Sequence, residues 1–119
     1  MNITVTSRIL SRTVIVDVSG RLCFLETSLS KQVDELLGEG HLEFVLNLAN
    51  VPYVDSFGLG QLITIRTSIL DKGGRLILLR PSDHLQQLLR LSKLTTVFDI
   101  SSEETQAVRS VHTSIAVSA

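Results

Sequence analysis

The chain has 119 residues, of which 44% are hydrophobic, and its formal net charge is −1 with acidic and basic residues scattered along it. This composition excludes a disordered chain and lacks the basic clusters that bind nucleic acid or anionic membranes. The length fits one domain, residues 1–119, and no apolar run is long enough to span a bilayer. Cys23 is the single cysteine, so no internal disulfide forms, and no basic-then-apolar leader opens the chain; both features predict a cytoplasmic protein.

The first half of the chain predicts a hairpin, a helix and a central strand. Residues 2–10 and 12–20 alternate apolar and polar side chains, as in two paired strands that turn around residues 10–12. Residues 42–50, rich in apolar side chains on both faces, predict a strand covered by helices. Between them, apolar residues recur at helical intervals until Gly38 and Gly40 end the run: Leu25, Leu29, Val33, Leu36 and Leu37.

The second half continues the alternation of helix and strand. A second helix is predicted from about Ser56 to Gly73 or Gly74, followed by a strand at 75–80 and a short helix capped by Ser82. A last strand at 96–100 precedes a closing helix, whose start carries the Ser101–Glu104 capping-box spacing. The apolar residues expected to pack from these three helices are Leu59, Leu62, Ile63, Ile69 and Leu70; Leu85, Leu88, Leu89 and Leu91; and Ala107, Val108, Val111 and Ile115.

This order of elements predicts an α/β layered domain. A mixed, mostly parallel sheet would be opened by an antiparallel hairpin and covered by about four helices. In such sheets, sites tend to lie where loops leave the carboxyl ends of the strands. Two segments are predicted to be such loops, residues 19–26 (SGRLCFLE) and 49–58 (ANVPYVDSFG). Asn47 is expected to support the second loop, and Tyr53 is either a rim contact or a lid over the core.

Ser56 admits three interpretations: a helix cap, a catalytic nucleophile or a modified residue. Gly58 and Gly60 follow it in the first helical turn, where each costs about 1 kcal/mol relative to alanine. Their presence therefore indicates close approach of another surface or a phosphate to the helix start. Asp55 adds negative charge at the same place. A phosphoryl group on Ser56 would add about −1.5 to −2 charges there, a change that a binding partner would sense.

Catalysis has little support in the sequence. Val54 occupies the first glycine position of the G-x-S-x-G nucleophile elbow, and His41, His84 and His112 are dispersed and predicted to be surface residues. No short spacing of cysteine and histidine indicates a metal site, and neither a P-loop nor a dinucleotide fingerprint is present. The sequence thus predicts no cofactor and no enzymatic activity, with a small hydrolase using Ser56 as a remote rival.

A family resemblance covers nearly the whole chain. The segments VLNLANVPYVDSFGLGQLI (residues 45–63) and KGGRLILLRPSDHLQQLLRLSKLTTVFDI (residues 72–100) resemble the STAS domain of bacterial anti-sigma factor antagonists. The resemblance implies that Ser56 is phosphorylated by an anti-sigma factor that is also a serine kinase, and that a serine phosphatase resets it. The unphosphorylated protein would bind the anti-sigma factor and free the sigma factor.

The resemblance also implies where the partner binds. The expected partner-binding residues are Asp55, Ser56, Phe57, Gly58, Leu59, Gly60, Arg21, Cys23 and Tyr53, in a monomer or weak homodimer that does not contact nucleic acid or membrane. Two of them depart from the family pattern. Phe57 stands where a small hydroxyl residue is usual, and Cys23 stands where many members have aspartate. These departures keep an alternative open, a non-switching STAS scaffold or ligand-sensing module, and Cys23 itself is either a half-buried packing residue or a redox site.

Overall fold

The computed structural model describes residues 3–23 and 26–118, and it describes side-chain environments up to Val111. Within these residues the strands are β1 (Ile3–Leu10), β2 (Thr13–Leu22), β3 (Glu43–Val54), β4 (Arg75–Leu79) and β5 (Asp99–Ser101). The helices are α1 (Ser28–Gly38), α2 (Ser56–Asp71), α3 (Asp83–Leu91) and α4 (Glu104–Ser118). None of the helices in the described part of the chain is both long and apolar enough to cross a membrane.

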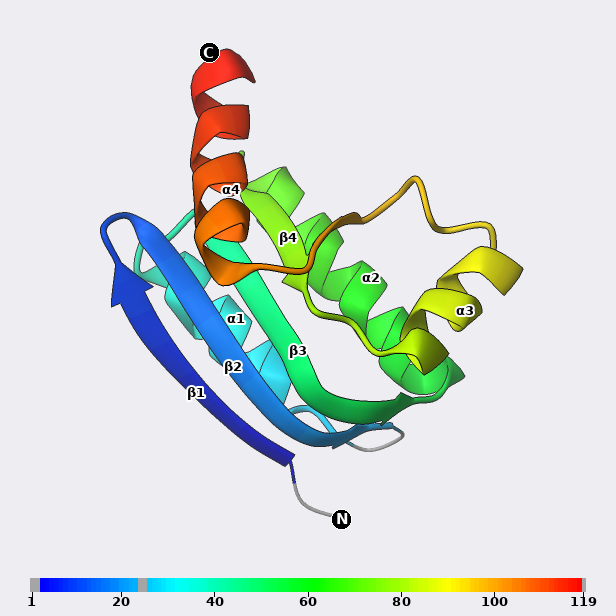
Figure 1. Cartoon of the computed structure of the whole chain (residues 1–119). Coiled ribbons are helices and arrows are strands. Elements are labelled where there is room, and N and C mark those ends of the chain that lie inside the picture. Colours follow the sequence, from blue (N-terminus) through cyan, green and yellow to red (C-terminus); the bar gives the residue numbers. More distant parts are fainter. Residues whose placement is uncertain (1–2, 24–25, 119) are drawn as a thin grey trace.

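The strands form one mixed sheet in the order β1-β2-β3-β4-β5 (Figure 1). β1 pairs antiparallel with β2 through the turn at Ser11 and Arg12, and each later neighbour pairs in parallel. The predicted hairpin, mixed sheet and four covering helices are therefore confirmed. Parallel neighbours need a crossover, which α1, α2 and α3 supply on one face of the sheet. The closing helix α4 covers the other face, so the central strands are buried on both faces.

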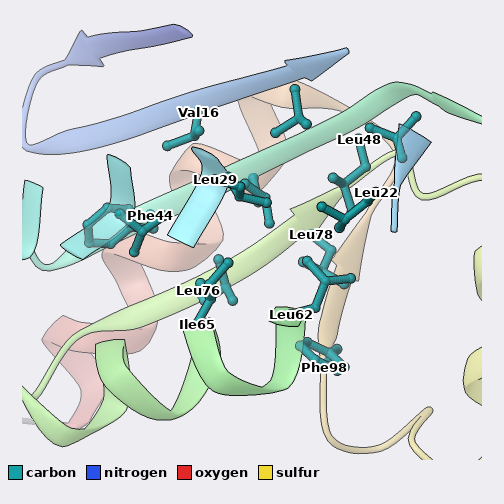
Figure 2. Packing of buried hydrophobic residues seen from close by; sticks show 14 of the residues in the cluster. Val16, Leu22, Leu29, Phe44, Leu48, Leu62, Ile65, Leu76, Leu78 and Phe98 are labelled. Carbon is teal, nitrogen blue, oxygen red and sulfur yellow. The ribbon is translucent and has the colours of Figure 1, made fainter. Parts of the chain in front are cut away.

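One face of the sheet carries the larger apolar cluster, which we call the first face. Alternate residues of β2, β3 and β4 point toward α1, α2 and α3, as the period of two requires (Figure 2). Val16, Phe44 and Leu78 form the centre of this layer, each at most 1% exposed. The helical residues that meet them include Leu29 and Leu62, so aliphatic packing holds α2 and its first turn against the strands.

The second face is covered by α4 alone among the described helices (Figure 1). Its smaller cluster consists of Ile15, Val45, Ile77, Leu79, Ala107 and Val111, with Val108 packed against it. The predicted docking of the closing helix is thus confirmed for Ala107, Val108 and Val111, while the side chain of Ile115 lies outside the described residues. The predicted capping box is wrong, because α4 begins at Glu104 and Glu103 directly precedes it. The Ser101 hydroxyl donates to the Glu103 carbonyl and accepts from the Glu103 amide, so its partner is Glu103 and not Glu104.

Several helix details differ from the sequence prediction. Ile63 and Leu70 are each 37% exposed, and Ile65 is buried in their place. Leu91 is 76% exposed because it lies on the outer side of the last turn of α3, whereas Leu85 and Leu89 are buried. The left-handed residue after α2 is Gly73, with φ +84°, and the Ser82 hydroxyl accepts from the Leu85 amide, both as predicted. The predicted strand at 96–100 is shorter and later, and Leu25 is outside the described residues.

Candidate functional site

The site is built on the carboxyl ends of β2 and β3, which run further than the sequence predicted. Residues 19–22 and 49–54 are strand, with Arg21 opposite Tyr53 and Leu22 opposite Val54. The predicted strands ended at residues 20 and 50, so the loop prediction is wrong for residues 21–22 and 51–54. The register shifts twice after Asp17, which breaks the alternation that marks a strand. Burial drives the extension: Leu22 and Val54 are at most 1% exposed.

Asp55 caps α2, and Ser56 is the first residue inside the helix. Asp55 has extended backbone angles, and its Oδ1 accepts a hydrogen bond from the Gly58 amide at 2.8 Å. The interpretation of Ser56 as the helix cap is therefore wrong. A carboxylate at this position satisfies an orphan amide and also interacts favourably with the helix dipole. The Ser56 side chain is exposed, and it has no hydrogen-bond partner in the described part of the chain.

The two glycines of the first turn differ in what they accommodate. A Cβ on Gly58 would lie 2.2 Å from the Leu22 carbonyl oxygen, which also accepts from the Asp55 amide at 3.3 Å. Gly58 is therefore needed for the close packing of α2 on the end of β2. A Cβ on Gly60 would meet nothing within 4 Å, so this position leaves a flat, exposed patch on the helix. Beside it Phe57 is 61% exposed, while Leu59 is buried.

An aromatic stack lies at the end of β3, just before the cap. The Arg21 guanidinium carbon sits 4.5 Å from the centroid of the Tyr53 ring, and the His84 ring stacks on Tyr53 at 5.3 Å and 15°. His84 Nε2 is 3.1 Å from the Val54 carbonyl oxygen, which makes it a donor. His84 was predicted to be a surface residue, and it is exposed. Its ring is held by the stack on Tyr53 and by the hydrogen bond to the Val54 carbonyl. Tyr53 thus contacts both a cation and an imidazole, which makes it a rim residue.

Cys23 lies in the connection from β2 to α1, beside the start of α2. It is half-buried with a free thiol, and its carbonyl accepts from the Glu26 amide at 3.1 Å. The Gln61 side-chain amide donates to the Glu26 carbonyl, which ties this connection to α2. Arg21, Tyr53, Cys23 and the first turn of α2 are therefore brought to the same end of the sheet.

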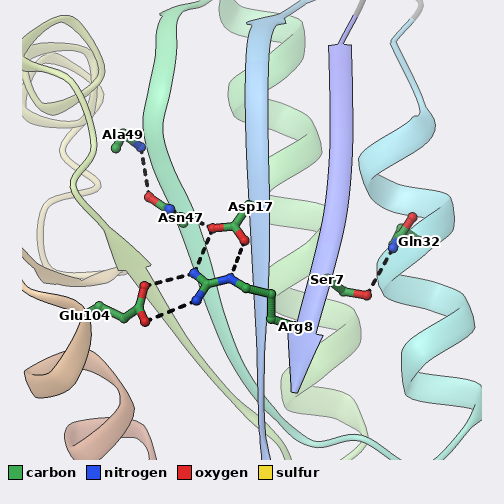
Figure 3. A network of polar contacts seen from close by, with 7 residues as sticks. All are labelled: Ser7, Arg8, Asp17, Gln32, Asn47, Ala49 and Glu104. Atoms are coloured by element: carbon green, nitrogen blue, oxygen red, sulfur yellow. Dashed lines mark hydrogen bonds and ion pairs between the residues drawn. The ribbon is translucent and has the colours of Figure 1, made fainter. Parts of the chain in front are cut away.

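Asn47 contacts the segment predicted to present Ser56 at the first residue of that segment, Ala49, so the prediction is confirmed at this contact alone. Its side-chain amide donates to Asp17 at 2.7 Å, and its oxygen accepts from the Ala49 amide at 3.1 Å (Figure 3). Asn47 and Asp17 belong to a polar network on the second face, well back from the strand ends. No local sequence signal indicated this contact, because the two residues come from neighbouring strands.

Arg8 is the centre of that network. Its guanidinium donates to Asp17 at 2.6 and 3.0 Å and to Glu104 at 2.9 and 3.2 Å (Figure 3). These hydrogen bonds lower the pKa of the Asp17 and Glu104 carboxyl groups and raise the pKa of Arg8. The network joins β1, β2 and the first turn of α4, so it fastens the last helix to the sheet rather than forming the site.

Comparison with known proteins assigns the family. The STAS domain model matches residues 2–107, and the chain belongs to the STAS domain family. A Thermotoga maritima protein named as a candidate anti-sigma factor antagonist is 34% identical over 79 residues, which cover 64% of this chain and 70% of that protein. A related Thermotoga neapolitana protein is 30% identical over the same shares.

Solved structures agree with this assignment. The crystal structure of the Thermotoga maritima candidate anti-sigma factor antagonist superposes with a TM-score of 0.82 and 28% identity, covering 91% of this chain and 94% of that one. The phosphorylated form of the Bacillus cell fate determinant SpoIIAA shares the fold, with a TM-score of 0.70 and 21% identity over 89% of this chain and 98% of that one.

Proposed function

We propose that this chain is an anti-sigma factor antagonist that binds its partner through the start of α2 and is released by phosphorylation of Ser56. The observation that carries the proposal is that Asp55, and not Ser56, supplies the cap of α2. Asp55 caps the helix, so the exposed Ser56 hydroxyl has no structural duty at the helix start. The partner class is taken from the names of the homologous Thermotoga proteins.

The surroundings of Ser56 suit a docking surface. Gly60 leaves the helix flat and Phe57 offers an exposed aromatic ring, and both features favour close apposition of a second protein. A helix N-terminus tolerates added negative charge because its dipole and amides stabilise it. Phosphorylation would therefore leave the fold intact and act on binding.

The covalent step is an ordinary phosphoryl transfer. The γ-phosphoryl of ATP passes to Ser56 Oγ as the bond to ADP breaks, and the hydroxyl proton goes to a base of the kinase. We assign the kinase activity to the anti-sigma factor and the reverse hydrolysis to a serine phosphatase. This chain contributes only the acceptor: His84, the histidine fixed near this end of the sheet, is committed to the Val54 carbonyl.

The size of the switch follows from electrostatics at a desolvated interface. Repulsion and lost contacts of about 2 to 4 kcal/mol weaken binding by roughly 30-fold to 1000-fold. We therefore expect Ser56→Asp to reduce partner affinity by at least an order of magnitude and Ser56→Ala to leave it nearly unchanged. Ser102→Asp is the matched control, because it adds the same charge at an exposed position just before another helix.

The deciding experiment is a pull-down from the native host with wild-type, Ser56→Ala, Ser56→Asp and Ser102→Asp baits, together with the intact mass of recovered wild type. The proposal requires a kinase-like partner on every bait except Ser56→Asp, and one phosphate on part of the wild type. Equal recovery by all four baits with no phosphate would instead establish the alternative, a non-switching STAS scaffold or ligand-sensing module. The exposed Phe57 ring is the feature that favours that alternative, since it fills a docking surface without any need of the hydroxyl.

A further inference from the structure

We propose that Arg21 binds the phosphoryl group of phosphorylated Ser56 and leaves the ring of Tyr53 to do so. The inference rests on the proposed phosphorylation of Ser56 and concerns what this chain does with the charge once it is present. In the unphosphorylated structure the Arg21 guanidinium lies over the Tyr53 ring, 4.5 Å from its centroid, and the His84 ring stacks on the same tyrosine at 5.3 Å.

The backbone places Arg21 beside the first turn of α2. The carbonyl of the next residue, Leu22, accepts from the Asp55 amide and lies where a Cβ on Gly58 would be. Arg21 is also the direct strand partner of Tyr53, three residues before Ser56. The side chains of Arg21 and Ser56 are both exposed at this end of the sheet. The inference requires the flexible arginine side chain to move to the serine across the surface, with no passage through the core.

The relative strength of the two contacts gives the direction of the change. An exposed cation–π contact is weak, whereas a guanidinium pairs with a phosphate through two charge-assisted hydrogen bonds. A dianion on Ser56 therefore draws Arg21 away from the ring. His84 stays stacked on Tyr53 because Nε2 is held by the Val54 carbonyl.

The consequence is a change in two surface features from one modification. The charge on Ser56 is partly neutralised by Arg21, and the part of the Tyr53 ring that Arg21 covers becomes accessible. Partner release then depends on the loss of the Arg21–Tyr53 surface as well as on charge repulsion. Arg21 then takes part in the switch by binding the phosphoryl group on Ser56, in addition to its contact with Tyr53.

The test installs phosphoserine at position 56 of the full chain by genetic encoding and follows the second ionisation of the phosphate by ³¹P NMR. The other titratable groups near this end are retained in every variant of this titration: Cys23, Glu26, Tyr53, Asp55 and His84. We expect the phosphate pKa in the wild-type background to lie roughly one unit below its value in Arg21→Gln. Arg66→Gln is the matched control: it removes the same charge on α2 about 15 Å from Ser56 and should leave the phosphate pKa unchanged.

A second readout follows the Arg21 Nε–H resonance in the unphosphorylated and phosphoserine proteins. Stacking on Tyr53 shifts this proton upfield, as comparison with Tyr53→Leu establishes, and the upfield shift should disappear in the phosphoserine form. Equal phosphate pKa values in wild type and Arg21→Gln, or an upfield shift that persists in the phosphoserine protein, would overturn the inference. Both measurements use installed phosphoserine, so they stand apart from the pull-down that tests whether a kinase modifies Ser56 at all.

Discussion

The two faces of the sheet are held to their helices by different forces. On the first face, apolar side chains from three strands and three helices make one continuous buried cluster. On the second face, a smaller cluster under α4 is supplemented by the Arg8 network, whose ion pairs remain a third to a half exposed. The first face therefore depends on packing and the second partly on charge. The proposed docking surface belongs to the first face, because α2 packs into the larger cluster. We therefore expect α2 to stay in place when the contacts of α4 are weakened.

Deleting a buried leucine on each face measures this difference most directly. Leu62 and Leu79 are both fully buried, the first on α2 where it faces the sheet and the second on β4 beneath α4. We expect Leu62→Ala to lower the free energy of unfolding by about 3 to 4 kcal/mol and Leu79→Ala by about 2 to 3, because the single helix over the second face has more room to relax into the cavity. Urea denaturation followed by circular dichroism gives both values. Ile63→Ala, at a half-exposed site on α2, is the control and should cost under about 1 kcal/mol. Equal losses for Leu62→Ala and Leu79→Ala would remove the distinction between the faces.

The two glycines near the start of α2 allow a closely packed position to be compared with an exposed one, by the effect of alanine on stability. Gly58→Ala places a methyl group against the Leu22 carbonyl and should destabilise the protein by about 2 kcal/mol or more. Gly60→Ala has open space and should stabilise the helix by up to about 1 kcal/mol. Thermal unfolding of the two variants should therefore shift in opposite directions. Stabilisation by Gly58→Ala would mean that α2 does not rest on β2 as closely as described.

The cap of α2 provides the next smaller effect. Asp55→Ala removes the acceptor for the Gly58 amide and should cost about 1 kcal/mol, whereas Ser56→Ala should change stability by less than about 0.5 kcal/mol. Asp55→Asn keeps an oxygen acceptor and is the control that separates capping from charge. The result would count against this arrangement if Ser56→Ala proved the more destabilising of the two alanine variants, since Ser56 would then be the cap.

Much of the fold was predictable because its signals are local. The period of two in β2, the helical spacing in α1 and the glycine after α2 each depend on neighbouring residues only. The expectation that a site lies at the carboxyl ends of the strands followed from the same alternation and stays a prediction. The extension of β2 and β3 did not, because the register shifts hide the alternation and Pro52 lies within β3.

The missed features of the site are of two kinds. Asp55 and Ser56 are both good caps, and the choice between them depends on which residue has extended backbone angles, a property of the strand end rather than of composition. The stack of Arg21, Tyr53 and His84 joins three segments, and the Arg8–Glu104 pair joins β1 to α4 across nearly the whole sequence. A single sequence carries no local sign of such contacts, because each depends on the tertiary arrangement.

Among these predictions, breaking the Arg8 network should change the free energy of unfolding least at neutral pH, and this change should depend most clearly on pH. Its hydrogen bonds depress the pKa of Asp17 and Glu104 in the folded protein. Their contribution is present above the unfolded values near 4 and is lost as the pH falls through the lower folded values. Arg8, whose pKa is raised above an already high value, stays charged throughout.

We therefore expect Arg8→Gln to cost about 1 kcal/mol or less at pH 7, since the groups are partly solvated, and to cost little at pH 2. High salt should shrink the difference at pH 7. Urea denaturation at both pH values and two salt concentrations measures this, with Arg75→Gln, which breaks the exposed Arg75–Asp99 pair, as the matched control. Because α2 is held on the other face, Arg8→Gln should leave partner affinity unchanged while increasing amide exchange in α4. A loss of affinity parallel to the loss of stability would show that the two faces are coupled, and that the docking surface depends on the charge network as well as on packing.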